Sequence, residues 1–144
     1  MIKAACHCTA VRFEIDRPPE WVLDCNCTIC RRYGAVWSYY HRGDGPQQLL
    51  SQPSADVTDT YLWGDRELAF HRCKVCGCVT HIAAVRAAMV YAVNARMMLD
   101  LNPAGVRILQ VDNGHSGHFW TRSDGPPRKS EHPPMPPLGP DDWR

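Results

Sequence analysis

Long apolar runs are missing from this sequence, and so is a secretory leader. No stretch approaches the roughly 20 consecutive apolar residues that a membrane-spanning helix requires. The N-terminus shows no basic region followed by an apolar run and a cleavage site. We therefore expect a cytoplasmic protein with no membrane partner, and its 144 residues are enough for one domain.

Clustered positive charge is equally scarce. The longest run of Lys and Arg is the pair Arg31-Arg32, and the formal net charge is +1. If seven thiolates held two Zn²⁺ ions, the net charge would fall to about −2. A nucleic-acid-binding protein needs a clustered basic face. We therefore expect no nucleic-acid partner and favour a small-molecule substrate, whereas the oligomeric state stays open.

Cysteine is abundant, with eight residues in closely spaced C-x-C and C-x-x-C groups. In a reducing cytosol such spacing favours metal binding over disulfides. The alternative is a secreted disulfide framework. Cysteines so close in sequence suit that alternative poorly, because they could not link distant segments.

The group Cys25, Cys27 and Cys30 has C-x-C-x-x-C spacing. Three thiolates fill three corners of a zinc tetrahedron and leave one free. Structural zinc sites are usually closed by four protein ligands, whereas catalytic sites keep a position for water or substrate. The spacing therefore predicts a catalytic zinc centre with an exchangeable fourth ligand.

The remaining cysteines predict a second, closed centre. Cys6 and Cys8 together with Cys73 and Cys76 give the four thiolates typical of structural zinc. Cys78 is left over. It is either a spare ligand for the open centre or a packed small hydrophobic residue.

Three histidines could complete the open centre: His41, His71 and His81. Each lies in a predicted strand, where a lone histidine is more often an ordinary hydrogen-bonded residue. Acid–base work is a further alternative, since an unperturbed pKa near 6.5 suits proton transfer.

Four polar residues are candidates for binding the substrate. Arg31 and Arg32 directly follow Cys30 and would form either a solvated surface pair or an anion clamp for a carboxylate-bearing ligand. Asn94 and Arg96 stand among apolar neighbours and need partners if they are buried. Their roles would be structural hydrogen bonding or ligand binding.

The rest of the chain reads as short strands separated by turns, which indicates a mostly β fold of antiparallel sheets with little helix. A short helical turn is expected from Cys27 to Tyr33, ended by Gly34 at its C-cap. The predicted strands are 2–6, 10–16, 21–23, 35–41, 48–50, 57–63, 67–72, 79–85 and 106–111. Residues 91–98 are expected to begin as a strand and turn into a short helix that ends before Pro103.

The composition changes near the C-terminus. Residues 126–140 hold seven prolines, so we expect this stretch to form neither a strand ladder nor a helix. The predicted organisation is a zinc-binding catalytic domain over 1–120 and a proline-rich tail over 121–144.

Taken together, these motifs resemble the glutathione-dependent formaldehyde-activating enzyme family, which includes centromere protein V. The resemblance covers roughly residues 3 to 112. It rests on Cys6-His7-Cys8, Asp24 to Ala35 with its DCNCTICRRYGA sequence, Tyr61-Leu62-Trp63-Gly64, Phe70 to Cys78 with its FHRCKVCGC sequence, and Val93-Asn94-Ala95-Arg96.

The resemblance implies a β-tent fold, the same structural and catalytic zinc sites, and a carbon–sulfur lyase activity. That activity is the formation of S-hydroxymethylglutathione from glutathione and formaldehyde, and a related thiol or carbonyl is an alternative substrate. Two other classes remain open. One is a non-catalytic zinc module that binds a protein partner, and the other is a thiol redox or zinc-storage protein.

Overall fold

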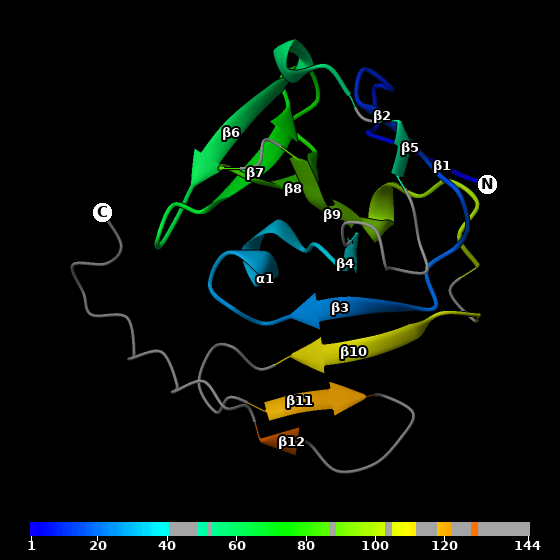
Figure 1. The fold of residues 1–144 in the computed structure, drawn as a ribbon, viewed down its shortest axis with the longest axis vertical. Coiled ribbons are helices and arrows are strands. Elements are labelled where there is room, and N and C mark those ends of the chain that lie inside the picture. The colour runs from blue at the N-terminus through cyan, green and yellow to red at the C-terminus, as the bar shows by residue number, and fades with distance from the viewer. Residues whose placement is uncertain are drawn as a thin grey trace.

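The structure is a computed structural model, and it describes residues 1–40, 49–51, 53–86, 89–102, 105–111, 118–121 and 128–129. Within these residues the chain forms two β-sheets with very little helix (Figure 1). The predicted fold class, mostly β, is confirmed. No helix among the described residues is long and apolar enough to cross a membrane.

The smaller sheet has the order β1-β2-β5, formed by Ile2–Ala5, Arg12–Ile15 and Leu49–Ser51. In β2 the apolar Phe13 and Ile15 are buried while Arg12 and Glu14 are exposed. This alternation follows from the two-residue period of a strand, which turns successive side chains to opposite faces. The sheet therefore has one face in the core and one in solvent.

The larger sheet has the order β12-β11-β10-β3-β4-β9-β8-β7-β6 among the described residues. Its strands are β3 Trp21–Cys25, β4 Trp37–Tyr39, β6 Thr58–Leu62, β7 Leu68–Cys73, β8 Val79–Ala84, β9 Met89–Asn94, β10 Arg107–Val111, β11 His118–Thr121 and β12 Arg128–Lys129. The helical elements are α1 Cys30–Tyr33, η1 Ala55–Val57 and η2 Ala95–Met97.

Two features of the larger sheet differ from the expectation. The pairing of β3 with β10 is parallel, although the other described pairs are antiparallel. The tail also contributes a strand, because β12 pairs with β11 and the expectation of no ladder in 126–140 was wrong there. Arg128 and Lys129 have backbone N–H groups that the neighbouring prolines lack, which permits this short pairing.

The larger sheet packs on both faces. On one face, Phe70 and Ile82 are paired across β7 and β8 and belong to a core with Trp37 and Cys30. A second core, which includes Phe13, fills the space beside the smaller sheet. Adjacent residues on a strand point to opposite faces. The strands β7 and β8 therefore separate two environments.

The short helix α1 follows the end of β3 after a loop. It ends at Gly34, which adopts the left-handed conformation with φ 60°, as predicted for its C-cap. The Gly34 N–H donates to the carbonyl of Cys30. This cap fixes the single helical turn that carries Cys30.

Candidate metal centres

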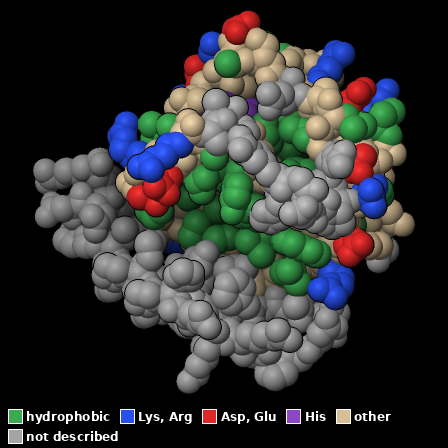
Figure 2. Space-filling model, in the orientation of Figure 1, with side chains coloured by type: hydrophobic (Ala, Val, Ile, Leu, Met, Phe, Trp, Pro, Cys, Tyr) green, Lys and Arg blue, Asp and Glu red, His purple; other side chains and the backbone are tan. Residues whose placement is uncertain are grey.

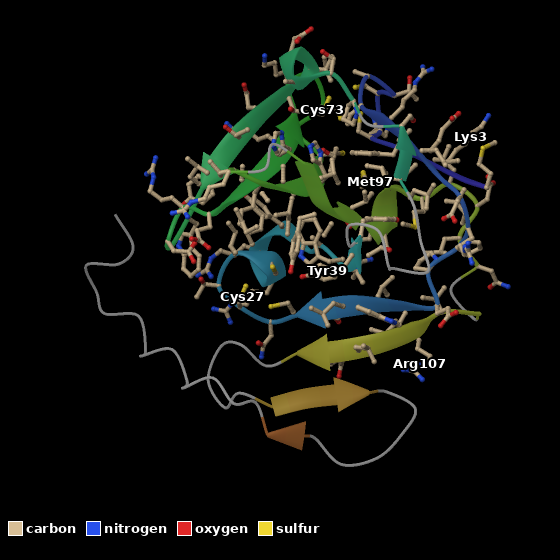
Figure 3. The ribbon with its side chains drawn as sticks, in the orientation of Figure 1. Lys3, Cys27, Tyr39, Cys73, Met97 and Arg107 are labelled. Atoms are coloured by element: carbon tan, nitrogen blue, oxygen red, sulfur yellow. The ribbon has the colours of Figure 1, made fainter. Side chains whose placement is uncertain are left out.

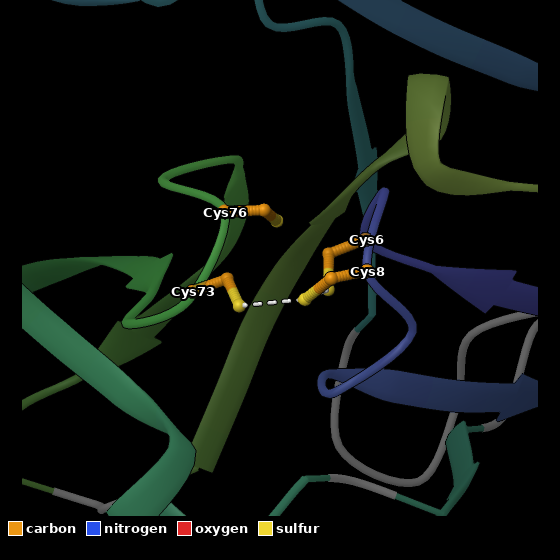
Figure 4. Close-up of side chains that lie close together, drawn as sticks. All are labelled: Cys6, Cys8, Cys73 and Cys76. Atoms are coloured by element: carbon orange, nitrogen blue, oxygen red, sulfur yellow. Dashed lines mark hydrogen bonds between the residues drawn. The ribbon is translucent and has the colours of Figure 1, made fainter.

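Four cysteines from two distant parts of the chain meet at one point. Cys6 and Cys8 lie in the turn between β1 and β2, while Cys73 ends β7 and Cys76 lies in the turn before β8 (Figure 4). The Cys8 Sγ lies 3.6 Å from the Sγ of Cys6 and 3.6 Å from that of Cys73. A tetrahedral zinc with bonds near 2.3 Å places its sulfurs about 3.8 Å apart. The group therefore fits a four-sulfur zinc site.

Backbone groups hold this first cluster. The Val11 N–H donates to the Cys6 Sγ at 3.3 Å, and the Gly77 N–H closes the Cys73 turn by donating to the carbonyl of Cys73 at 2.9 Å. Gly77 has φ 73°, a conformation that glycine adopts without steric cost. Burial raises the pKa of Cys6 to about 12, whereas a hydrogen bond with the backbone of Cys78 lowers the pKa of Cys76 to about 5. A bound cation would replace the proton on the more basic thiols.

The eighth cysteine, Cys78, does not join either cluster among the described residues. Its side chain packs against the core beside the smaller sheet. Its carbonyl accepts a hydrogen bond from the Cys73 N–H at 2.9 Å. The structure therefore favours the packed small residue over the spare ligand.

The second cluster is built from one short segment. Cys25 ends β3, Cys27 lies in the following loop, and Cys30 begins α1. The three sulfurs all lie within 4.8 Å of one another. Cys25 and Cys30 are buried, whereas Cys27 is half-buried and faces the solvent side of the group. Figure 3 shows Cys27 beside α1, well away from Cys73.

Two N–H groups donate hydrogen bonds to sulfurs of this second cluster. The indole Nε1 of Trp37 donates to the Cys30 Sγ at 3.2 Å, and the Cys27 N–H donates to the Cys25 Sγ at 3.5 Å. Such donors stabilise a thiolate. Hydrogen bonds from Cys25 and Cys30 hold the pKa of Cys27 far below its usual range, while hydrogen bonds to Cys25 and Cys27, together with burial, raise the pKa of Cys30. The three sulfurs thus form one coupled unit that suits a cation.

The fourth position of the second cluster has no Cys, His, Asp or Glu ligand within the described part of the chain. His71 and His81 instead stack on each other, with ring centroids 4.1 Å apart. His41 lies outside the described residues. A three-sulfur donor set with a free corner is the arrangement expected of a catalytic zinc.

The four predicted substrate-binding residues do not converge. Arg31 and Arg32 are exposed on α1, and the Arg32 Nη1 donates to the carbonyl of Thr28 at 2.7 Å. Asn94 is buried and uses its amide to bond the backbones of Val36, Val79 and Arg96. Arg96 is exposed on η2, next to β1. Only Arg31 and Arg32 lie beside the three-sulfur cluster.

Trp37 is the functional candidate that the sequence did not single out. It is fully buried, and its ring contacts Phe70 edge-on with centroids 6.2 Å apart. Phe70 in turn contacts Tyr33 at 6.0 Å. An aromatic residue in a strand is ordinarily read as core. Nothing local in the sequence indicates that its N–H reaches a cysteine seven positions earlier.

The surface around this region is apolar at its centre. In the orientation of Figure 1, hydrophobic side chains gather in the middle of the visible face, with Lys, Arg, Asp and Glu around its edge (Figure 2). The described charged residues form no broad basic patch on this face. This arrangement suits a small molecule better than a polyanion.

Fold and sites together define a class: a mostly β protein with a four-sulfur and a three-sulfur centre, both able to hold a metal ion. The family model described as "Glutathione-dependent formaldehyde-activating enzyme" matches residues 1–121. The chain belongs to this family. It is also similar to the crystal structure of a Rhodobacter sphaeroides protein, at 28% identity and a TM-score of 0.54, over 71% of this chain and 92% of that one.

Proposed function

We propose that this protein is a zinc-dependent carbon–sulfur lyase. Its reaction joins a thiol, such as glutathione, to formaldehyde or a related carbonyl compound. The observation that supports the proposal is the three-sulfur group of Cys25, Cys27 and Cys30 without a fourth described ligand. Membership of the family supports the same chemistry at a coarser level.

Two zinc ions are proposed, with Cys6, Cys8, Cys73 and Cys76 holding the structural one. Cys25, Cys27 and Cys30 would hold the other. When bound there, zinc would lower the pKa of a substrate thiol and make it a nucleophile near neutral pH. In the overall reaction a carbon–sulfur bond forms, the thiol loses its proton, and the carbonyl oxygen gains one.

The protein's own groups set the environment for that reaction. The Trp37 N–H fixes the Cys30 sulfur and withdraws part of its negative charge. The rings of Trp37, Phe70 and Tyr33 exclude water from the buried side of the cluster. The half-buried Cys27 leaves the other side accessible. The substrate is proposed to approach from the side of Cys27.

Arg31 and Arg32 are proposed to bind a substrate carboxylate. Both lie on α1 directly after Cys30, and basic residues are the usual partners of carboxylates. Arg32 is already positioned by its bond to the carbonyl of Thr28. A cytosolic location, also proposed, would keep the thiols reduced for metal binding.

The experiment that tests the proposal is zinc stoichiometry combined with X-ray absorption, with and without glutathione. Two zinc ions per chain are expected, and one should exchange a light-atom ligand for a fourth sulfur when glutathione is added. Cys27→Ser should lose this response. Cys78→Ser is the matched control, because Cys78 belongs to neither cluster.

The alternative classes correspond to other results of the same experiment. Two zinc ions with four sulfurs each, unchanged by glutathione, would contradict the lyase and favour a non-catalytic binding module. Zinc that is lost readily while disulfides form would favour a redox or storage protein. Neither result is expected from a cluster with three sulfurs and a buried N–H donor.

A further inference from the structure

A cavity of about 410 Å³ lies on the face of the larger sheet opposite the three-sulfur cluster. His71 and His81 line it and are paired across β7 and β8. The next pair in this register, Phe70 and Ile82, belongs to the core that contains Cys30. The sheet therefore separates the cavity from the proposed reaction centre.

The two imidazole rings form a stacked pair in this cavity. Their centroids are 4.1 Å apart and their planes are inclined by 18°. Phe13 of the smaller sheet contacts the His81 ring edge-on at 5.2 Å. His81 is only 4% exposed, so its orientation is fixed by packing on both sides.

Two threonines determine which ring nitrogen carries the proton. The Thr80 hydroxyl lies 2.9 Å from the His81 Nδ1 and 3.4 Å from the carbonyl oxygen of His71. The arrangement that satisfies both contacts has the hydroxyl donate to the carbonyl and accept from the His81 Nδ1–H, since a hydroxyl has a single donor. The His81 Nε2 is left as a bare acceptor.

The same hydrogen-bond argument applies to the His71 ring. The Thr58 hydroxyl lies 2.9 Å from the His71 Nδ1 and 3.5 Å from the carbonyl oxygen of Ala55. The arrangement that satisfies both contacts has the hydroxyl donate to the carbonyl and accept from the His71 Nδ1–H, which makes the His71 Nε2 an acceptor as well. Neither Nε2 has a hydrogen-bond partner among the described residues. His81 is buried, whereas His71 is half-buried. A buried acceptor without a partner costs free energy unless a ligand or water satisfies it.

The shape and chemistry of the cavity narrow the ligand class. Leu62, Ala69 and Val90 contribute apolar walls, and Thr60 adds one hydroxyl. Two acceptor nitrogens repel an anion, and burial keeps His81 neutral by lowering its pKa to about 3. Two stacked rings are a poor chelate for one metal ion, and no third metal ligand joins them among the described residues.

We propose that this cavity is a second binding site, for a small uncharged molecule with an apolar body and an O–H or N–H group. That group would donate a hydrogen bond to the Nε2 atom of His71 or of His81. The cavity volume falls within the range of small-molecule sites. The site is independent of the thiol chemistry proposed above.

The test compares phenol with anisole on the zinc-loaded protein by NMR titration. The two probes have similar bodies, but only phenol donates a hydrogen bond. We expect phenol to bind about fivefold to tenfold more tightly, the value of one hydrogen bond. Long-range ¹H–¹⁵N spectra should show the Nδ1–H tautomer for both rings and a shift of at least one Nε2 signal with phenol.

Two variants remove the site in different ways. His81→Phe keeps a stacked ring but removes one acceptor, so the preference for phenol should shrink. Leu62→Trp leaves both histidines and fills the cavity from the edge strand β6, so both probes should lose binding. Tyr61→Phe is the control, because Tyr61 lies on the opposite face of the same strand.

Three results would overturn the proposal. The first is equal affinity for phenol and anisole, and the second is full binding by Leu62→Trp. The third is an Nε2–H tautomer in the free protein, which would present donors to the cavity. Since activity with glutathione is not part of the test, its outcome does not depend on the proposed lyase reaction.

Discussion

The two cysteine clusters differ in how far apart along the chain their members lie. The four-sulfur cluster joins the turn after β1 to the turn after β7, so that Cys8 meets Cys73 across 65 positions. The three-sulfur cluster is confined to Cys25, Cys27 and Cys30. The four-sulfur cluster connects distant elements, whereas the three-sulfur cluster lies at the end of one strand and the start of one helical turn.

This difference assigns different tasks to the two centres. A metal bound across a long loop contributes directly to folding, because the unfolded chain does not bring its ligands together. A metal bound within six residues contributes less to the tertiary fold. Its free corner is available for chemistry. Each of the following experiments tests this division between a structural cluster and a reactive one.

The largest effect is expected from Cys73→Ser, which removes a ligand of the four-sulfur cluster. The variant should lose one zinc ion and about 5 kcal/mol or more of stability, comparable to the whole stability of a small domain. Zinc content and urea unfolding would measure this.

Cys78→Ser is the control for that loss and should keep both ions with an unfolding midpoint near that of the unaltered protein. If Cys73→Ser retained two zinc ions and normal unfolding, the structural assignment of this cluster would be wrong.

The next effect is expected from Cys27→Ser in the three-sulfur cluster. Activity with glutathione and formaldehyde should fall by more than the roughly 10- to 100-fold that loss of an outer partner costs. The fold should survive, because Cys27 is half-buried and links no distant segments. Circular dichroism and zinc content would be measured together with activity. If Cys27→Ser lost as much stability as Cys73→Ser, the division between a structural and a reactive cluster would be wrong.

Strand β8, which carries His81, introduces a pH dependence of its own. The pKa of His81 falls from about 6.5 in the unfolded chain to about 3 in the folded protein, because burial disfavours its charge. Between these values the unfolded chain binds more protons, so stability falls as the pH drops below 6.5. The slope approaches about 1.4 kcal/mol per pH unit.

The measurement for this pH dependence is urea unfolding between pH 7 and pH 4.5, comparing the unaltered protein with His81→Gln. The difference between the two isolates the histidine from acid release of metal, which both proteins share. Parallel curves for the two proteins would show that His81 contributes no such slope.

A smaller and more local effect is expected from Trp37→Phe. Loss of the indole N–H should weaken zinc binding at the three-sulfur cluster by about tenfold and leave the four-sulfur cluster unchanged. Competition with a chelator would report the two affinities separately. Trp21→Phe is the control, because it also replaces an indole by a phenyl ring. The indole of Trp21 stacks on Tyr39. If both variants bound zinc equally weakly at the three-sulfur cluster, the effect would come from a general loss of packing and not from the lost N–H donor.

Much of the fold was predictable because its signals are local. The alternation of Val11, Phe13 and Ile15 with polar residues indicates a half-buried strand, and Gly34 marks the end of the helical turn. Both cysteine groups also followed from spacing, including the long-range pairing of Cys6 with Cys73. That pairing succeeded because two half-sites of two thiolates each make one complete four-thiolate site.

Other features could not be predicted, since they depend on which strands become neighbours. The parallel pairing of β3 with β10 and the short strand β12 are examples. Asn94 shows the same limit. Its sequence context allowed ligand binding, whereas its amide is engaged with three backbone segments.

Thiol spacing and strand alternation act over a few residues, so the sequence alone indicated which cysteines gather into the two clusters and the β character of the chain. Only the tertiary structure placed the Trp37 N–H on the Cys30 sulfur and stacked His71 on His81 in a cavity. Those contacts depend on strand register, and a shift of one residue would turn each side chain to the other face of the sheet.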